Sequence, residues 1–238
     1  MVATHDWAAF IRANTRLLAP PLVPEILLHL AEESLPIWRK TEEELGEMNV
    51  PPPYWAFAWA GGQALARYLL DHPELVAGRS ALDLGSGSGL TAVAAMKAGA
   101  TNVLAADIDE VSLAAARFNA LANGVEIATT SRDLLAETPA REWDLVLVGD
   151  LYYERTLADR VTAYIEAAAG HGATILIGDP GRSYFPKGRF TKVADYRVAV
   201  TRELEDAEIK QTAVWRLGEQ GAKDYAFFSQ RPASVCCQ

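Results

Sequence analysis

Short apolar segments alternate with segments of helical character through the middle of the chain, and this alternation constrains the fold more than any other feature. The apolar segments are rich in Val, Leu and Ile, so we expect them to be buried strands. Strands separated by helices form a parallel sheet with helices on both faces. The expected strands are residues 80–85, 102–107, 125–130, 143–150 and 173–180, and the expected helices are residues 62–70, 89–98, 109–122 and 154–169.

The C-terminal third of the chain is expected to complete this sheet. Residues 209–217 and 224–230 have the pattern of two paired strands, whereas residues 188–196 are expected to form a short helix. Together with the five parallel strands they predict an α/β fold, with a doubly wound, seven-stranded and mostly parallel sheet of Rossmann-like type. Residues 51–238 are assigned to this domain.

Residues 1–50 are expected to be an N-terminal helical extension of the main domain. A first helix is expected over residues 4–18, a second apolar segment covers residues 23–30, and residues 38–47 have the composition of a solvated helix. The three consecutive prolines at 51–53 are expected to end helical structure, because proline cannot continue a helix.

Composition excludes several classes of protein. Half of the 238 residues are hydrophobic, which is enough for a large core without disulfides or a metal, and the net charge is −9. Proteins that coat nucleic acid or an anionic membrane need a positive face, so neither partner is expected. The four histidines are scattered without the spacing of metal ligands, so no metal site is expected.

The chain is expected to be cytoplasmic. Its N-terminus lacks the basic and apolar regions of a secretory signal, and no segment approaches the roughly 18 apolar residues of a membrane-spanning helix. The two cysteines, Cys236 and Cys237, are sequence neighbours that cannot cross-link the fold, which fits a reducing compartment.

The clearest signal for a binding site is the DLGSGSG turn between the first expected strand and the next helix. Gly85, Gly87 and Gly89 let the backbone turn tightly and approach a ligand closely. A dinucleotide fingerprint would need a glycine where the chain has Leu90. Asp83 would repel a pyrophosphate but would bind an ammonium group. The turn therefore favours the methionine end of S-adenosylmethionine over NAD.

Two later acids extend this nucleoside site. Asp107 ends the second strand, where a carboxylate can accept hydrogen bonds from ribose hydroxyls. Its alternative role would be to cap the following helix, although Asp109 fits that role better. Asp133 follows the third strand and is expected to meet the adenine amine, with Leu134 against the adenine ring.

Residues after the fourth strand are expected to face the reacting centre, because ligands of doubly wound sheets bind outside the carboxyl ends of the strands. Gly149 is assigned to cofactor binding, and Asp150 and Tyr153 are assigned to catalysis. A carboxylate can orient an incoming ammonium group, and an aromatic face can stabilise it by a cation–π contact. Of the adjacent Tyr152 and Tyr153, we expect one to pack inward and the other to line the site.

Two other segments are candidates for contact with a ligand or partner. Trp59 and Gly61 are assigned to a lid over the cofactor, because the Gly61-Gly62 pair allows close approach. A basic stretch after the fifth strand is expected to be a solvated face, with docking of a partner as the alternative. Its members are Arg182, Lys187, Arg189, Lys192 and Arg197.

These motifs resemble those of the seven-β-strand methyltransferases, in particular the protein-lysine branch. The D-x-x-Y pattern of Asp150 and Tyr153 is typical of that branch. Residues 51–73 and 201–215 are similar to the electron transfer flavoprotein β-subunit lysine methyltransferase family, and the resemblance covers residues 50–230. It implies S-adenosylmethionine as methyl donor and protein lysines as acceptors. It also implies the flavoprotein β-subunit as substrate, with ribosomal protein L7/L12 as a second one.

The motifs describe the donor side better than the acceptor side, so alternatives stay open. A small-molecule amine could replace the protein lysine, or the chain could bind S-adenosylmethionine as a non-catalytic partner protein. RNA as acceptor is disfavoured by the negative charge, and NAD-linked chemistry is disfavoured by Asp83 and Leu90. The modified lysine, the number of methyl groups and the oligomeric state have no signal in the sequence.

Overall fold

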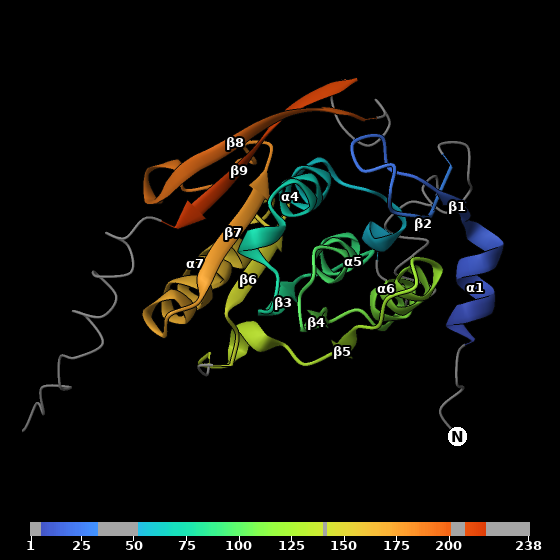
Figure 1. Ribbon diagram of the computed structural model, residues 1–238, viewed down its shortest axis with the longest axis horizontal. Coiled ribbons are helices and arrows are strands. Elements are labelled where there is room, and N and C mark those ends of the chain that lie inside the picture. The colour runs from blue at the N-terminus through green and yellow to red at the C-terminus, as the bar shows by residue number, and fades with distance from the viewer. Residues whose placement is uncertain (1–5, 33–51, 140–141, 201–207, 218–238) are drawn as a thin grey trace, which may run out of the picture.

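A computed structural model of the chain describes residues 6–32, 52–139, 142–200 and 208–217. Its centre is a seven-stranded sheet in the order β5-β4-β3-β6-β7-β9-β8 (Figure 1). The first five strands of this order are parallel, and β9 is antiparallel to both β7 and β8, so the expected doubly wound sheet is confirmed. The strands are β3 (Ser80–Leu84), β4 (Asn102–Ala106), β5 (Ala128–Thr130), β6 (Leu145–Gly149), β7 (Thr174–Asp179), β8 (Phe190–Ala199) and β9 (Ile209–Leu217).

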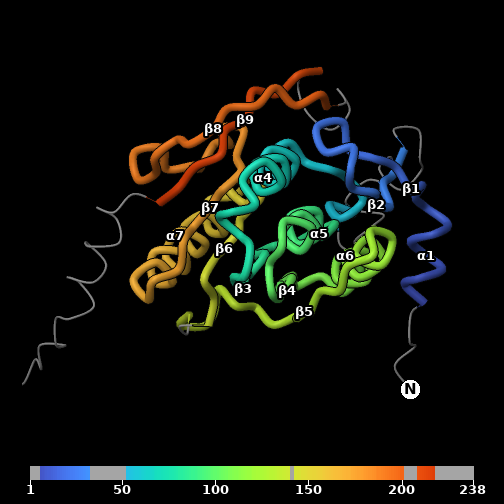
Figure 2. The backbone as a smooth tube through the Cα atoms, viewed as in Figure 1, coloured from blue at the N-terminus to red at the C-terminus, as the bar shows by residue number. Residues whose placement is uncertain are grey.

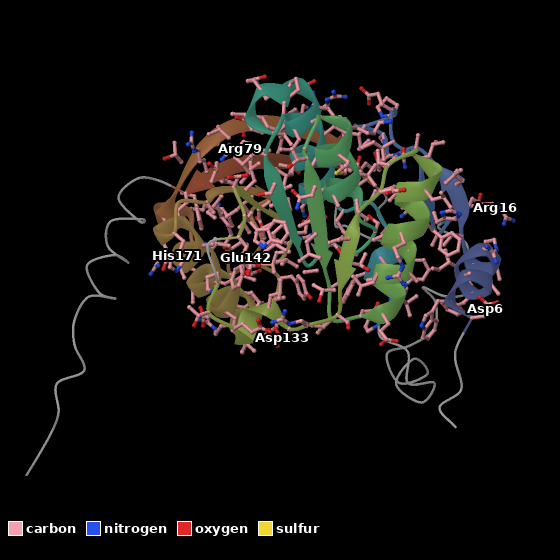
Figure 3. All side chains as sticks on the ribbon, turned by 60° about the horizontal axis from the view of Figure 1, so that its bottom comes forward. Asp6, Arg16, Arg79, Asp133, Glu142 and His171 are labelled. Atoms are coloured by element: carbon pink, nitrogen blue, oxygen red, sulfur yellow. The ribbon has the colours of Figure 1, made fainter. Side chains whose placement is uncertain are left out.

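The order of the strands reverses at β3, which makes the neighbourhood of β3 the switch point of the sheet. β4 and β5 extend the sheet to one side of β3, and β6 and β7 extend it to the other. Arg79, just before β3, and Asp133, after β5, lie at opposite ends of the strands (Figure 3). In sheets of this kind a ligand binds outside the carboxyl ends, where the order reverses.

Helices cover both faces of the sheet. α4, α5 and α6 lie beside one another on one face, and α7 lies on the other (Figure 1). Because side chains alternate along a strand, Leu145 and Leu147 pack toward α4 and α5, whereas Val146 and Val148 pack toward α7. The helices are α4 (Ala60–Asp71), α5 (Leu90–Lys97), α6 (Glu110–Ala122) and α7 (Arg155–Gly170).

The expected helices of the central domain are confirmed, and carboxylates start two of them. Asp109 accepts hydrogen bonds from the amides of Val111 and Ser112 and thereby caps α6. Glu154 caps α7 in the same way. These side chains satisfy amides that have no partner within the helix, so they fix where each helix begins after its strand.

The strand β8 contradicts the helix expected over residues 188–196. Thr191, Val193, Tyr196 and Val198 are β-branched or aromatic residues, which favour a strand. The segment pairs along its whole length with β9, with a bulge between Lys192 and Ala194. As an edge strand it has an irregular burial pattern, which hides the alternation that normally identifies a strand. The strand expected over residues 224–230 lies outside the described residues.

The N-terminal extension is helical only in part, so the expected helix to residue 18 is wrong. α1 (Trp7–Asn14) begins after Asp6, whose carboxylate caps it. The chain then becomes extended in β1 (Arg16–Leu18), which pairs antiparallel with β2 (Leu28–Leu30). Three prolines between these strands, at positions 20, 21 and 24, prevent helix continuation. The helix expected over residues 38–47 and the boundary between residues 50 and 51 lie outside the described residues.

This N-terminal segment packs beside α6, at the periphery of the molecule (Figures 2 and 3). Asn123 Oδ1 accepts a hydrogen bond from the Leu27 amide at 2.9 Å, and Asn119 Oδ1 accepts one from the His29 amide at 2.7 Å. Asn119 of α6 and Asn123, which directly follows this helix, therefore pair with the backbone of the extension and hold it in place.

The remaining helices in the described ranges are short 3₁₀ turns. None of the helices that the structure describes is long and apolar enough to cross a membrane. The 3₁₀ turns are η1 (Tyr54–Ala56), η2 (Pro73–Leu75), η3 (Leu134–Ala136) and η4 (Lys187–Arg189).

Candidate active site

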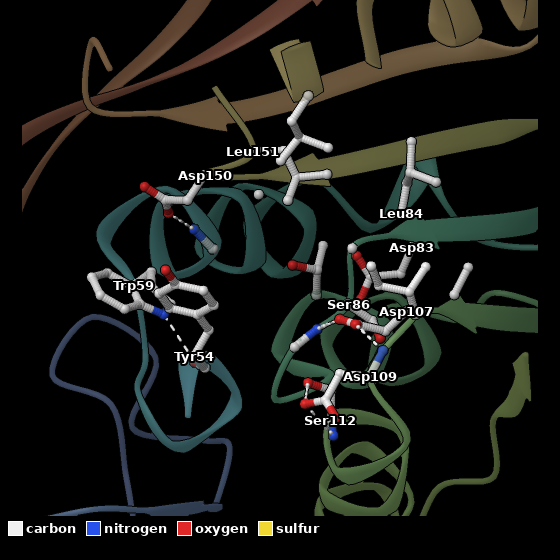
Figure 4. A pocket seen from close by; sticks show the side chains of 18 of the residues that line it. Tyr54, Trp59, Asp83, Leu84, Ser86, Asp107, Asp109, Ser112, Asp150 and Leu151 are labelled. Carbon is white, nitrogen blue, oxygen red and sulfur yellow. Dashed lines mark hydrogen bonds between the residues drawn. The ribbon is translucent and has the colours of Figure 1, made fainter. Parts of the chain in front are cut away.

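A cavity of about 570 Å³ opens at the carboxyl ends of β3, β4 and β6. Its position at the switch point is where a doubly wound sheet is expected to bind a ligand, and its volume suits a nucleoside-sized molecule. The cavity has two sides, which Figure 4 shows. One side carries Asp150, Trp59 and Tyr54, and the other carries Asp83, Ser86, Asp107, Asp109 and Ser112.

The glycine-rich turn belongs to the side of the cavity that carries Asp83, Ser86 and Asp107. Gly85, Gly87 and Gly89 all have positive φ, at 66°, 50° and 74°, which favours glycine at each position. A Cβ on Gly85 would lie 2.6 Å from the side chain of Leu151, and a Cβ on Gly89 would lie 2.8 Å from that of Ala116. Gly85 and Gly87 line the cavity, whereas Gly89 lets α5 pack closely against α6.

Asp83 lies beneath this turn, at the end of β3. Its side chain is almost fully buried, and Oδ2 accepts a hydrogen bond from the Ala92 amide at 3.0 Å. Burial, opposed by that hydrogen bond and reinforced by the nearby Asp107, raises the pKa of Asp83 to about 8. A buried carboxyl of this kind gains stability when a cationic group comes to it, as expected for an ammonium ligand.

Asp107 ends β4 and holds the turn from the other direction. Its Oδ2 accepts from the Gly87 amide at 2.9 Å, and its Oδ1 accepts from the Asp109 amide at 3.0 Å. Burial raises the pKa of Asp107 despite these two bonds. Asp107 therefore lines the cavity, as expected for a residue that binds ribose hydroxyls. Asp109 takes the role of helix cap.

The outer wall beyond Asp107 contains Asp133 and Leu134, as the sequence predicted. Asp133 Oδ2 accepts a 2.6 Å hydrogen bond from Arg160, which also lines the cavity. Contact between Asp133 and an adenine amine stays a prediction, because this ion pair already engages one oxygen. Leu134 offers an apolar surface beside it.

Asp150 is held rigidly on the opposite side, directly after β6. Its φ of 57° lies in the left-handed region, where aspartate is tolerated at a modest energetic cost. Oδ2 accepts from the Gly62 amide at 3.0 Å, and Oδ1 accepts from Nε and Nη2 of Arg182 at 3.1 and 2.8 Å. The carboxylate therefore has a fixed direction before any ligand arrives.

Gly61 does not line the cavity, but its missing side chain leaves room for the carboxylate of Asp150. A Cβ at this position would lie 2.2 Å from the carbonyl oxygen of Gly178 and 2.5 Å from Oδ2 of Asp150. The close approach that the Gly61-Gly62 pair suggested is therefore an approach to β7 and to Asp150. Gly149, next to Asp150, does line the cavity.

Aromatic side chains form the wall beside Asp150. The rings of Tyr54 and Trp59 are 6.1 Å apart, and those of Tyr54 and Tyr153 are 5.8 Å apart. The Trp59 indole donates to the Tyr54 carbonyl at 2.9 Å. Tyr153 lines the cavity and is half exposed, whereas Tyr152 is fully buried among the core residues beside α7. The expected division between the two tyrosines is confirmed.

Sequence reasoning missed Arg182 and Asp179 as parts of this site. Arg182 was grouped with the basic stretch, yet its guanidinium turns inward and lies 5.6 Å from the Trp59 ring centroid. Asp179 ends β7, and its Oδ1 accepts from the amides of Gly181 and Arg182 at 2.6 and 2.8 Å. Their position at the carboxyl end of a strand is the signal that could have found them.

Other basic residues of that stretch behave as surface groups. Arg189 pairs with Glu166, and Lys192 pairs with Asp195 at 2.9 Å. The solvated-face interpretation therefore holds for these two residues and fails for Arg182.

The cavity as a whole can hold a nucleoside on one side and a basic group on the other. The chain is 37% identical over 217 residues to the electron transfer flavoprotein beta subunit lysine methyltransferase of Danio rerio, across 89% of this chain and 83% of that protein.

This chain belongs to that lysine methyltransferase family. The Homo sapiens member is 36% identical over 213 residues, across 87% of this chain and 80% of that protein. A family model described as ribosomal protein L11 methyltransferase (PrmA) matches residues 64–167. The solved structure of a ribosomal protein L11 methylase from Lactobacillus delbrueckii subsp. bulgaricus aligns with a TM-score of 0.46 at 23% identity, over 68% of this chain and 81% of that one. Membership in the lysine methyltransferase family confirms the resemblance that the turn and the D-x-x-Y pattern indicated.

Proposed function

We propose that the chain transfers a methyl group from S-adenosylmethionine to lysine side chains of the electron transfer flavoprotein β-subunit. The observation that carries this proposal is the two-sided cavity. A glycine turn with two buried acids lies on one side, and a fixed carboxylate with an aromatic wall lies on the other. The relatives named for this activity match the chain along nearly nine-tenths of its length.

The donor side fits S-adenosylmethionine at four residues. Asp83 is a buried carboxyl suited to the methionine ammonium, and Asp107 lies where ribose hydroxyls would donate. Ser86 Oγ is buried and has no hydrogen-bond partner among the described residues, so a polar ligand would satisfy it. Gly87 lines the cavity without a side chain, so a ligand can approach the backbone at this position.

S-adenosylmethionine supplies a methyl group bound to a positively charged sulfur. In the transfer a bond forms between the lysine Nζ and the methyl carbon, the carbon–sulfur bond breaks, and its electron pair stays with sulfur. The protein contributes mainly alignment of the two reactants, which can supply roughly 7–11 kcal/mol of the barrier. Asp150 orients the amine, and the aromatic wall excludes water around it.

The amine must be neutral to attack, although free lysine has a pKa of about 10.4. Partial desolvation against Tyr54 and Tyr153 lowers the pKa of a lysine in this position. Asp150 alone would raise it, since a negative charge favours the ammonium form. We therefore assign Asp150 to positioning of the amine, and the proton is released to water.

Three finer points remain predictions. Ribosomal protein L7/L12 is a second proposed substrate, although the weaker relatives are named for ribosomal protein L11. Neither nucleic acid nor a membrane is proposed as a partner, because the net charge is −9. Cytoplasmic localisation is proposed from the placement of both cysteines at positions 236 and 237.

Intact-mass spectrometry tests the proposal. Purified electron transfer flavoprotein is incubated with the protein and S-adenosylmethionine, and we expect mass steps of one methyl group on lysines of the β-subunit. Asp83→Ala and Asp150→Ala should lose the steps, whereas Asp159→Ala, on the exposed face of α7, should retain them. L7/L12 and a panel of small amines are run in parallel. Methylation of these alone would contradict the flavoprotein assignment.

A further inference from the structure

Arg182 is held in a fixed position on the acceptor side of the cavity, next to Asp150. Two of its guanidinium nitrogens donate to a single oxygen of Asp150, and its side chain is only 19% exposed. The guanidinium carbon also lies over the Trp59 ring, 5.6 Å from its centroid. A carboxylate and an aromatic face are also the groups that would receive a lysine ammonium, so Arg182 already holds the place of a cation there.

The backbone around Arg182 is fixed by Asp179. Both the Gly181 and the Arg182 amides donate to Oδ1 of Asp179, which is 1% exposed at the end of β7. Gly181 has a φ of 87°, which a glycine adopts without strain. These two backbone hydrogen bonds fix the position of Arg182. The contact between Arg182 and Asp150 is therefore part of the folded structure.

The contact between Arg182 and Asp150 determines the charge that an acceptor amine meets. Arginine stays protonated at all working pH values, so the Asp150–Arg182 pair carries no net charge. A lysine ammonium that approached Asp150 would meet the guanidinium as a like charge. A neutral amine would carry no charge to meet the guanidinium, and its N–H can donate to a carboxylate oxygen.

We propose that Arg182 is a positioning residue that cancels the charge of Asp150, so that this carboxylate orients the acceptor lysine in its neutral, nucleophilic form. The inference rests on the proposed function, because it concerns the acceptor side of the same cavity. It resolves the conflict in which Asp150 by itself would favour the unreactive ammonium.

Among the residues that the structure describes, further titratable groups lie around the pair. Asp179 faces it from β7, and burial with the neighbouring Asp150 raises the pKa of Asp179 to about 7. Tyr54 and Tyr153 face it from η1 and from the loop after β6, and burial raises the pKa of Tyr153. Lys187 approaches Gly181 from η4. Asp179 titrates near neutrality, so the experiment must separate it from Arg182.

The first measurement is the pH profile of methyl transfer under single turnover with saturating S-adenosylmethionine. Arg182→Gln retains an N–H donor but removes the charge. It should move the rising limb of the profile, where the acceptor lysine loses its proton, to higher pH by about 1 unit or more. Transfer then falls about tenfold near pH 7 and approaches the wild-type rate at high pH. Arg182→Lys keeps the charge and should keep the limb in place.

Two further variants serve as controls. Arg155→Gln removes an arginine that, like Arg182, lies over an aromatic ring, that of Tyr184 at 5.0 Å, but whose partner is not Asp150. It should leave the limb unchanged. Asp179→Asn removes the nearby titration, and the Arg182→Gln shift should persist in that background.

A second measurement needs no turnover. With S-adenosylhomocysteine bound, the affinity for pentyltrimethylammonium, a fixed cation, is compared with that for pentanol by NMR titration. Arg182→Gln should bind the cation about tenfold more tightly than wild type, with pentanol unchanged. If wild type methylates no lysine but this gain is found, the charge compensation stands and the proposed function fails. An unshifted limb with an equal loss at every pH, or no gain in cation affinity, overturns the role of Arg182.

Discussion

The buried carboxyl of Asp83 should make the free energy of unfolding depend on pH. It is 2% exposed and accepts a hydrogen bond from the Ala92 amide, and its pKa is raised to about 8 by burial. The perturbation is Asp83→Asn, which keeps an oxygen to accept from Ala92 but cannot ionise.

The change in the free energy of unfolding follows from the difference between the pKa of Asp83 in the folded and in the unfolded chain. In the unfolded chain the Asp83 carboxyl ionises near pH 4, whereas in the folded chain it ionises near pH 8. A raised folded pKa gives stability that is complete below the unfolded pKa and is lost as pH rises through the folded one. Between these values the free energy of unfolding falls by about 1.4 kcal/mol per pH unit. From pH 6 to pH 8 the loss due to Asp83 is about 2 kcal/mol, since ionisation is half complete at pH 8.

The assay is urea unfolding of the cofactor-free protein at pH 6 and at pH 8. Asp107 and Asp179 also have raised pKa values, but they contribute to wild type and to Asp83→Asn alike. The difference in unfolding free energy between the two proteins should therefore change by about 2 kcal/mol in favour of Asp83→Asn at pH 8. Asp159→Asn, an exposed change, should track wild type. Parallel behaviour of wild type and Asp83→Asn at both pH values would refute the reasoning.

Two other predictions concern the elements that position the site. Gly61→Ala should lower the free energy of unfolding by about 1–3 kcal/mol, because its Cβ would collide with the Gly178 carbonyl oxygen. Gly62→Ala is the matched control, since its Cβ would meet its nearest neighbour at 3.9 Å, and chemical denaturation should show no loss for it. Asp109→Ala removes the cap of α6 and should cost about 1 kcal/mol in the same measurement. Equal stabilities for Gly61→Ala and Gly62→Ala would contradict the first prediction. A denaturation midpoint of Asp109→Ala equal to that of wild type would contradict the second.

The central sheet was predictable because each strand from β3 to β7 is a short apolar segment bounded by turn signals. The donor side was predictable for a related reason. Parallel strands bring their carboxyl ends to one edge, so Asp83, Asp107 and Asp150 had to meet there.

Features that depend on partners distant in sequence escaped prediction. β8 has no clean alternation, and its extended form follows from pairing with β9. The β1–β2 pair depends on Asn119 and Asn123 of α6, roughly 90 residues further along the chain. Arg182 turns inward because Asp179 fixes its amide, which a local pattern of basic residues does not reveal.

The cavity separates a donor side from an acceptor side, and one paired measurement can distinguish the two. S-adenosylmethionine affinity by calorimetry and methyl transfer by mass spectrometry are compared for Asp107→Ala and Asp150→Ala. We expect Asp107→Ala to lose affinity for the cofactor, since it removes the ribose partner and the contact with the Gly87 amide. We expect Asp150→Ala to bind the cofactor as wild type does but to transfer no methyl group. Loss of cofactor affinity in Asp150→Ala equal to its loss of transfer would contradict the account.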